Sequence, residues 1–170
     1  RIEDVPSVAV PEWVRQTVRV KPVSADDFAI PSDGATIRAI GLMAQIEKGE
    51  QKTDHPLATA IIHKVVNRRA LYVSILMHDI AKGRRGDHSV LGAELALKLG
   101  PRFGLDAKET ELVSWLVKTH LTMSATAFKR DLADWKTITD FVAQVQSIER
   151  LRLLAMLPMA VPGLVLGLGY

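Results

Sequence analysis

After residue 35, apolar residues recur every three or four positions, which is the spacing of one face of an α-helix. The first such stretch, TIRAIGLMAQIEKG, is expected to end at Gly49. The next, DHPLATAIIHKVVNRR over 54–69, offers Asp54 as its N-cap. A third, RALYVSILMHDIAKG over 69–83, is apolar on every side, which predicts a central, buried helix.

The second half of the chain continues the helical pattern. A helix over 88–100 should close at the Gly100-Pro101 pair, and the next should open with Asp106 and Glu109 as a capping box. The remaining predicted helices cover 125–134, 134–146 and 147–157, with Asp134 and Ser147 as candidate caps. No stretch alternates as a strand would. The sequence therefore predicts an all-α domain, a compact bundle of about seven or eight helices.

Both flanks differ from this bundle. Residues 1–35 carry four prolines and no long helical period, which predicts an irregular, extended N-terminal arm. Residues 153–170 hold no charge, but their prolines and glycines make a membrane-spanning helix unfavourable. We therefore expect a domain over 36–157, an irregular apolar tail over 158–170 and no membrane partner. The opening residues lack the apolar core of a secretory signal, so we expect a cytoplasmic protein.

Composition narrows the chemistry. Lys and Arg exceed Asp and Glu by 22 − 19 = +3, and the basic residues are dispersed rather than gathered in a stripe, which argues against a nucleic-acid partner. The chain has no cysteine, so any metal must be held by His, Asp or Glu. The imidazoles available are those of His55, His63, His78, His88 and His120.

The adjacent His78 and Asp79 end the apolar run of the central helix. Neighbouring side chains on a helix point about 100° apart, so both can reach one ion lying against that wedge. Imidazole and carboxylate together suit a divalent ion such as Mn, Fe, Zn, Co or Mg. The alternative is an ordinary helix end, in which Asp79 pairs with Lys82 or Arg84 and His78 is hydrogen-bonded in the core. The dipeptide alone favours this alternative.

Two further histidines change that balance. His88 opens the helix after the pair, where a short loop could return it toward His78, and His120 ends a helix on its core-facing side. Three histidines and one acid on three helices predict a metal centre of His78, Asp79, His88 and His120. By contrast, we interpret His55 and His63 as structural.

The loop after Asp79 contains Lys82, Arg84 and Arg85. Cations beside a metal centre neutralise the phosphate charge that the ion does not reach. Lys82, and to a lesser degree Arg84, are therefore candidates for binding a substrate phosphate. The alternative is that all three are solvated loop charges.

At these residues the chain resembles the HD superfamily of metal-dependent phosphohydrolases. More narrowly, it resembles the HD domain of the bacterial bifunctional PII uridylyltransferase/uridylyl-removing enzymes. The resemblance runs from about Thr36 to Leu154 through TIRAIGLMAQIEKGE, DHPLA, RRALYVSILMHDIAKGRRGDHSVLGAE, ETELVSWLVKTHLTMS, FKRDLAD and SIERLRLLA. It implies an all-α domain that removes UMP from the uridylylated tyrosine of the nitrogen-signalling protein PII. It also implies a divalent metal, Mn or Mg first, with Fe, Co or Zn as alternatives, and catalytic roles for Asp79 and Lys82. Larger family members add an N-terminal nucleotidyltransferase domain and C-terminal glutamine-sensing domains, and this chain contains neither.

Two ligands of the family pattern are missing. The first histidine is expected in the segment SDGAT, where Ala35 stands, and the final aspartate is expected after RLLAML, where the chain has no acid. These departures favour a rival reading, an HD-like regulatory or PII-docking module. Retention of all four central residues favours the enzyme. A break in the sequence at 29–36 and 157–170 would also remove both ligands.

Overall fold

The structure is a computed structural model that describes residues 34–160. Within that range it is helical and contains no strand, which confirms the all-α prediction. The elements are α2 Ala35–Lys48, α3 Pro56–Ile62, α4 Arg68–Met77, α5 His88–Leu99, the 3-10 helix η2 Gly100–Phe103, α6 Ala107–Thr119, α7 Thr122–Lys129, α8 Trp135–Val145 and α9 Ile148–Ala160. The expected N-terminal arm, apart from residues 34 and 35, and the tail after residue 160 lie outside the described residues.

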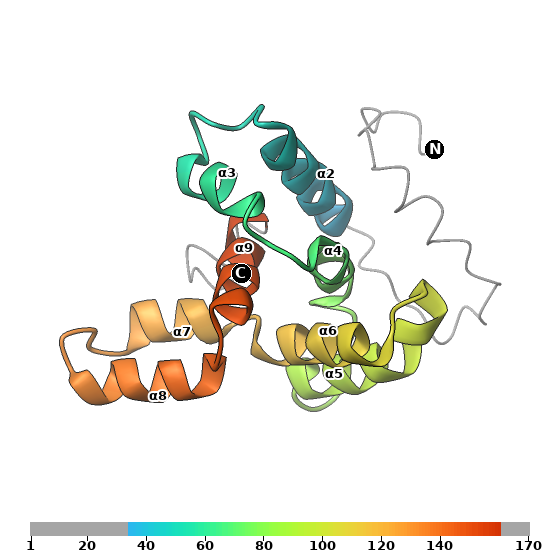
Figure 1. The fold of residues 1–170 in the computed structure, drawn as a ribbon. Helices are drawn as coiled ribbons and strands as arrows, with labels where there is room; N and C mark the ends of the chain where they lie inside the picture. The colour runs from blue at the N-terminus through green and yellow to red at the C-terminus, as the bar shows by residue number, and fades with distance from the viewer. Residues whose placement is uncertain (1–33, 161–170) are drawn as a thin grey trace.

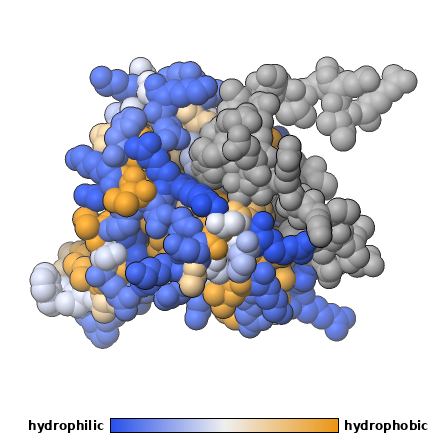
Figure 2. Space-filling model, turned by 45° about the vertical axis from the view of Figure 1, so that its right-hand side comes forward, coloured by the Kyte–Doolittle hydropathy of each residue, from blue (hydrophilic) through white to orange (hydrophobic). Residues whose placement is uncertain are grey.

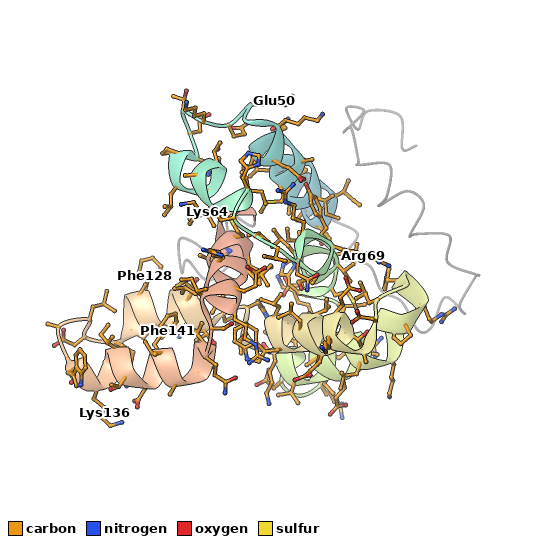
Figure 3. The ribbon with its side chains drawn as sticks, viewed as in Figure 1. Glu50, Lys64, Arg69, Phe128, Lys136 and Phe141 are labelled. Carbon is orange, nitrogen blue, oxygen red and sulfur yellow. The ribbon has the colours of Figure 1, made fainter. Side chains whose placement is uncertain are left out.

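Helix α4 is at the centre of the arrangement (Figure 1). Helices α2, α3 and α9 pack on one side of it, and α5 and α6 lie side by side on the other. Helices α7 and α8 form a hairpin that extends to the left in Figure 1, and both contact α9. In Figure 3, Phe141 lies between the two helices of this hairpin, whereas Lys136 projects outward from α8.

Two hydrophobic clusters share α4. Leu71 and Ile75 pack into a cluster with α2, α3 and α9, and Val73 and Met77 pack into a second cluster with α5 and α6. Side chains buried on both sides confirm that α4 is the central helix. Each fully buried aliphatic side chain contributes about 1.5–3 kcal/mol, so this double burial fixes the position of the helix end that follows.

Several predicted helix ends are confirmed by their hydrogen bonds. Asp106 and Glu109 form the expected capping box, with N–H to carboxylate distances of 2.8 and 2.9 Å. Asp134 accepts a hydrogen bond from the N–H of Lys136, and Ser147 accepts one from Arg150. Each cap satisfies a backbone N–H that the first turn of a helix leaves without a partner.

The helix predicted over 54–69 is wrong in two respects. The helix ends at Ile62 rather than near residue 69, so that residues 63–67 connect it to α4, which begins at Arg68, and its N-cap is His55 rather than Asp54. Pro56 has a fixed φ and no N–H, which suits it to the first helical position and makes the residue before it the cap. Glu149 stabilises the segment between α3 and α4, because its Oε1 atom accepts hydrogen bonds from the backbone N–H groups of residues 66 and 67.

The central helix also ends earlier than predicted, at Met77 rather than near residue 83. Beyond it the chain makes successive i to i−3 turns, including Lys82 N–H to Asp79 O at 2.9 Å, and Gly83 takes a φ of 85°. Ile80 and Ala81 remain buried. The apolar pattern therefore continues after the helix has stopped, which is why periodicity alone placed the end too late.

The last helices differ from their predicted limits by a few residues. Helix α7 begins at Thr122 rather than at residue 125, and α9 continues through Pro158 to Ala160. Among residues 34–160, no helix combines the length and the hydropathy needed to cross a lipid bilayer. Figure 2 shows a face on which hydrophilic side chains predominate, with smaller apolar areas between them.

Candidate metal centre

Three helix ends converge on one point and bring the four predicted ligands together. His78 follows the last residue of α4, His88 is the first residue of α5, and His120 follows the last residue of α6. Asp79 lies in the turn directly after His78. The fold thus delivers three imidazoles and one carboxylate from segments that are up to about forty positions apart in the sequence.

Asp79 lies at the centre of this group. Its Oδ1 atom is 3.8 Å from the Nε2 atoms of both His88 and His120, and its Oδ2 atom is 3.6 Å from Nε2 of His78. These distances are too long for direct hydrogen bonds. When one ion forms bonds of about 2.0–2.1 Å with two ligand atoms, those atoms lie about 3–4 Å apart. The distances around Asp79 match this spacing. Ligand atoms of Asp79, His88 and His120 all lie within 4.8 Å of one another, and His78 borders this group.

Backbone carbonyls orient two of the imidazoles. Nδ1 of His78 lies 2.7 Å from the carbonyl oxygen of Ile75, and Nδ1 of His120 lies 2.6 Å from that of Val117. A carbonyl only accepts, so each Nδ1 carries the proton and donates it, which leaves the Nε2 lone pair facing Asp79. Sequence reasoning missed these two carbonyls. The available signal is a histidine just past a helix end, where the carbonyl three residues earlier lacks a helical partner.

The electrostatics of the group suit a cation. Burial lowers the pKa of His120, which keeps its imidazole neutral. Burial alone would raise the pKa of Asp79, but its interactions with His78 and Lys82 together lower it, so the carboxylate stays ionised. Neutral imidazole and ionised carboxylate are the forms that bind metal ions.

An unsatisfied atom supports the same conclusion. His120 is fully buried, and its Nε2 atom has no hydrogen-bond partner among residues 34–160. A buried polar atom without any partner costs about 1–3 kcal/mol, so this nitrogen is expected to bind a group from outside these residues, such as an ion. The side chains of His88 and Asp79 are 34% and 19% exposed, which opens the group to solvent on one side. The donor set, its protonation and this opening fit a divalent metal ion.

One of the two candidate phosphate-binding cations, Lys82, lies at the exposed side of the cluster. Lys82 Nζ donates a hydrogen bond to Asp79 Oδ2 at 2.9 Å, and its side chain is 68% exposed. Arg84 lies two residues further along the same turn and is exposed. The ion pair expected of an ordinary helix end is therefore present, but it coexists with the three converging imidazoles.

The other histidines and acids do not join the cluster. His55 caps α3 and His63 ends it, away from the metal-binding group. In α9, Glu149 binds the α3–α4 connection, and no acid follows it as far as residue 160. At the start of α2, Ala35 offers no ligand atom in its side chain. In the described part of the chain, the group that could hold an ion therefore consists of Asp79, His88 and His120, with His78 beside it.

Comparisons with known proteins show the family of the chain. The chain is 73% identical over 125 residues to the bifunctional uridylyltransferase/uridylyl-removing enzyme of Novosphingobium aromaticivorans, and 65% identical over 125 residues to that of Erythrobacter litoralis. Each match covers 74% of this chain and only 14% of the relative. The family model of the HD domain matches residues 37–157. That match covers well over half of the chain, which therefore belongs to the HD domain family.

Proposed function

We propose that this chain is the uridylyl-removing domain of a bifunctional uridylyltransferase and hydrolyses the phosphodiester that joins UMP to a tyrosine of PII. The observation that carries the proposal is the convergence of three imidazoles on Asp79, where no described residue pairs with the buried Nε2 atom of His120. The names of the relatives, which include uridylyl removal, supply the substrate class.

The ion would be held by Nε2 of His78, His88 and His120 and by the carboxylate of Asp79. When bound, a divalent metal lowers the pKa of a coordinated water and polarises a phosphoryl oxygen. We propose Mn²⁺ or Mg²⁺, with Fe, Co or Zn as alternatives. Because three of the four ligands are imidazoles, which Mg²⁺ binds poorly, the donor set favours Mn²⁺ over Mg²⁺.

Lys82 and Arg84 would bind the substrate phosphate. Lys82 pairs with a carboxylate at the exposed side of the cluster, and its long, solvated side chain can turn toward an incoming anion without unfolding the turn. Because Asp79 would bind the ion and also pairs with Lys82, it would hold the ion and the Lys82 ammonium group close together. In the reaction, an oxygen–phosphorus bond forms from water while the bond from phosphorus to the tyrosyl oxygen breaks. The phenol of tyrosine ionises near pH 10 and is an acceptable leaving group.

We further propose that the partner is uridylylated PII and that the natural protein is longer. The chain spans 14% of the length of its relatives, which leaves room for the nucleotidyltransferase and glutamine-sensing domains that the resemblance implies. The HD domain would occupy 36–157, close to the residues that the family model matches.

The rival reading is a regulatory or PII-docking module that no longer turns over substrate. Ala35 and the absence of an acid at the end of α9 favour it, since both remove ligands of the family pattern. Two observations weigh against it. All four central residues of the family pattern are retained, and three of them form a group that could hold an ion. Among residues 34–160, no contact satisfies the buried Nε2 atom of His120.

The deciding experiment measures release of UMP from uridylylated PII by this chain with Mn²⁺ or Mg²⁺. We expect release that EDTA abolishes and that the His78→Ala, Asp79→Ala double variant lacks. His63→Ala is the matched control, because it removes an exposed histidine outside the cluster and should retain activity. Metal binding without release above background would support the regulatory module instead.

A further inference from the structure

Gly92 lies where the three segments that carry the metal ligands meet. It is one helical turn after His88 in α5 and is buried. A Cβ atom built on Gly92 would lie 2.9 Å from Cγ1 of Val117, 3.7 Å from Cγ2 of Ile80 and 4.0 Å from Cβ of Ala81. Helix α5 therefore touches both α6 and the turn after Asp79 at a position that has no room for a methyl group.

The atoms around Gly92 belong to close neighbours of the ligands. Val117 supplies the carbonyl that accepts the hydrogen bond from Nδ1 of His120, and Ile80 directly follows Asp79. A displacement at Gly92 would therefore be transmitted to His120 through the Val117 backbone and to Asp79 through the adjoining turn. Val117 cannot easily yield, because it is fully buried and a valine in a helix strongly prefers one χ1 rotamer.

We propose that Gly92 is a positioning residue of the metal centre: its missing side chain sets how closely His88 approaches His120 and Asp79. The inference rests on the proposed metal centre, because positioning these residues matters only if they bind a metal. The spacing between His88 and His120 can nevertheless be measured in the metal-free protein. It also gives a role to the glycine of the HSVLGA segment, which is not itself a metal ligand.

The spacing is measured first without metal, by nuclear Overhauser contacts between the ring protons of His88 and His120, whose centroids lie 5.5 Å apart. We expect Gly92→Ala to weaken or abolish this contact, and Gly92→Ala combined with Val117→Ala to restore most of it. Val117→Ala alone completes a double-mutant cycle, which measures the coupling between positions 92 and 117. Val117→Ile, which keeps Gly92 and adds one methyl to Val117, is a milder variant that remains informative if Gly92→Ala does not fold.

Gly100 provides a matched control at the other end of α5. A Cβ atom there would lie 2.6 Å from the side chain of Thr110 in α6, so Gly100→Ala forces the same two helices apart away from the ligands. We expect Gly100→Ala to lower the unfolding temperature while it preserves both the ring contact and the affinity for Mn²⁺. This control separates positioning from a general loss of stability.

Titration with Mn²⁺ is the second readout. We expect Gly92→Ala to weaken Mn²⁺ binding about tenfold or more, as loss of outer support for a metal ligand commonly does. An unchanged ring contact and unchanged Mn²⁺ affinity in both Gly92→Ala and Val117→Ile would overturn the inference. If the unaltered chain bound no Mn²⁺, the metal centre itself would be refuted, and the ring contact would still decide whether Gly92 sets the spacing.

Discussion

Nε2 of His120 lies 3.8 Å from Oδ1 of Asp79, although His120 is fully buried and no residue in the described part of the chain forms a hydrogen bond with this nitrogen. The gap is too wide for a hydrogen bond and suits an ion bound by both groups. This nitrogen is therefore available to an ion, and its replacement by an apolar side chain should affect metal binding more than folding.

His120→Leu should separate stability from metal binding. In EDTA, we expect the free energy of unfolding to fall by less than about 1 kcal/mol, because the unsatisfied Nε2 disappears together with the bond to Val117. With Mn²⁺ at about 100 times its dissociation constant, the unaltered chain should gain about 2.7 kcal/mol and His120→Leu almost nothing. Urea unfolding in EDTA and in Mn²⁺ measures both. A large loss in EDTA, or an equal gain with Mn²⁺, would contradict the account.

Lys82→Met should slow catalysis without weakening metal binding. Loss of the cation should lower kcat/KM for UMP release by about 10²-fold, since one electrostatic contact to the reacting group is gone. Mn²⁺ should bind as tightly as before or more tightly, because the Asp79 carboxylate loses its 2.9 Å competitor. Arg85→Met, in the same exposed turn, serves as the control with a smaller effect on kcat/KM. Weaker Mn²⁺ binding by Lys82→Met would show that Lys82 supports the ligand instead.

Glu149 should stabilise the break between α3 and α4. Its Oε1 atom accepts hydrogen bonds of 2.9 and 3.0 Å from the N–H groups of Val66 and Asn67. We expect Glu149→Ala to lower the free energy of unfolding by about 2 kcal/mol, because two backbone donors lose a charged acceptor. Glu149→Gln keeps an acceptor oxygen and should lose less. Equal losses in urea unfolding would assign the effect to charge rather than to these two bonds.

The hairpin of α7 and α8 should show a pH-dependent stability. The hydrogen bond from Lys136, aided by Arg130, lowers the pKa of Asp140 below the ordinary value of 3.8. A lowered pKa means that the stabilisation is complete above the ordinary value and is lost as the pH falls through the folded one. Asp140→Asn should therefore lower the unfolding temperature at neutral pH and have little effect in strong acid. A difference that grew on acidification would contradict this assignment.

Local chemistry in the sequence predicted some elements and misjudged others. The capping box of Asp106 and Glu109 depends on residues three positions apart, so it could be recognised without the fold. The end of α4 at Met77 could not be recognised in this way. The turn that follows is also buried, so its residues are apolar and continue the pattern of the helix. The break before Arg68 depends on Glu149, more than eighty residues away.

The candidate site follows the same division. His78 and Asp79 are adjacent, and the resemblance to the HD superfamily indicated His88 and His120 as well. The carbonyls that orient the imidazoles and the contact between Gly92 and Val117 arise only when α4, α5 and α6 pack together. The sequence could therefore indicate which residues to consider as ligands, whereas their orientation and spacing required the structure.

We propose that His78, Asp79, His88 and His120 form one divalent-metal centre, and isothermal titration with Mn²⁺ can decide whether they do. We expect saturable binding by the unaltered chain and by His63→Ala, and no binding by the His78→Ala, Asp79→Ala double variant. Equal binding by the unaltered chain and the double variant would show that these residues do not hold the metal.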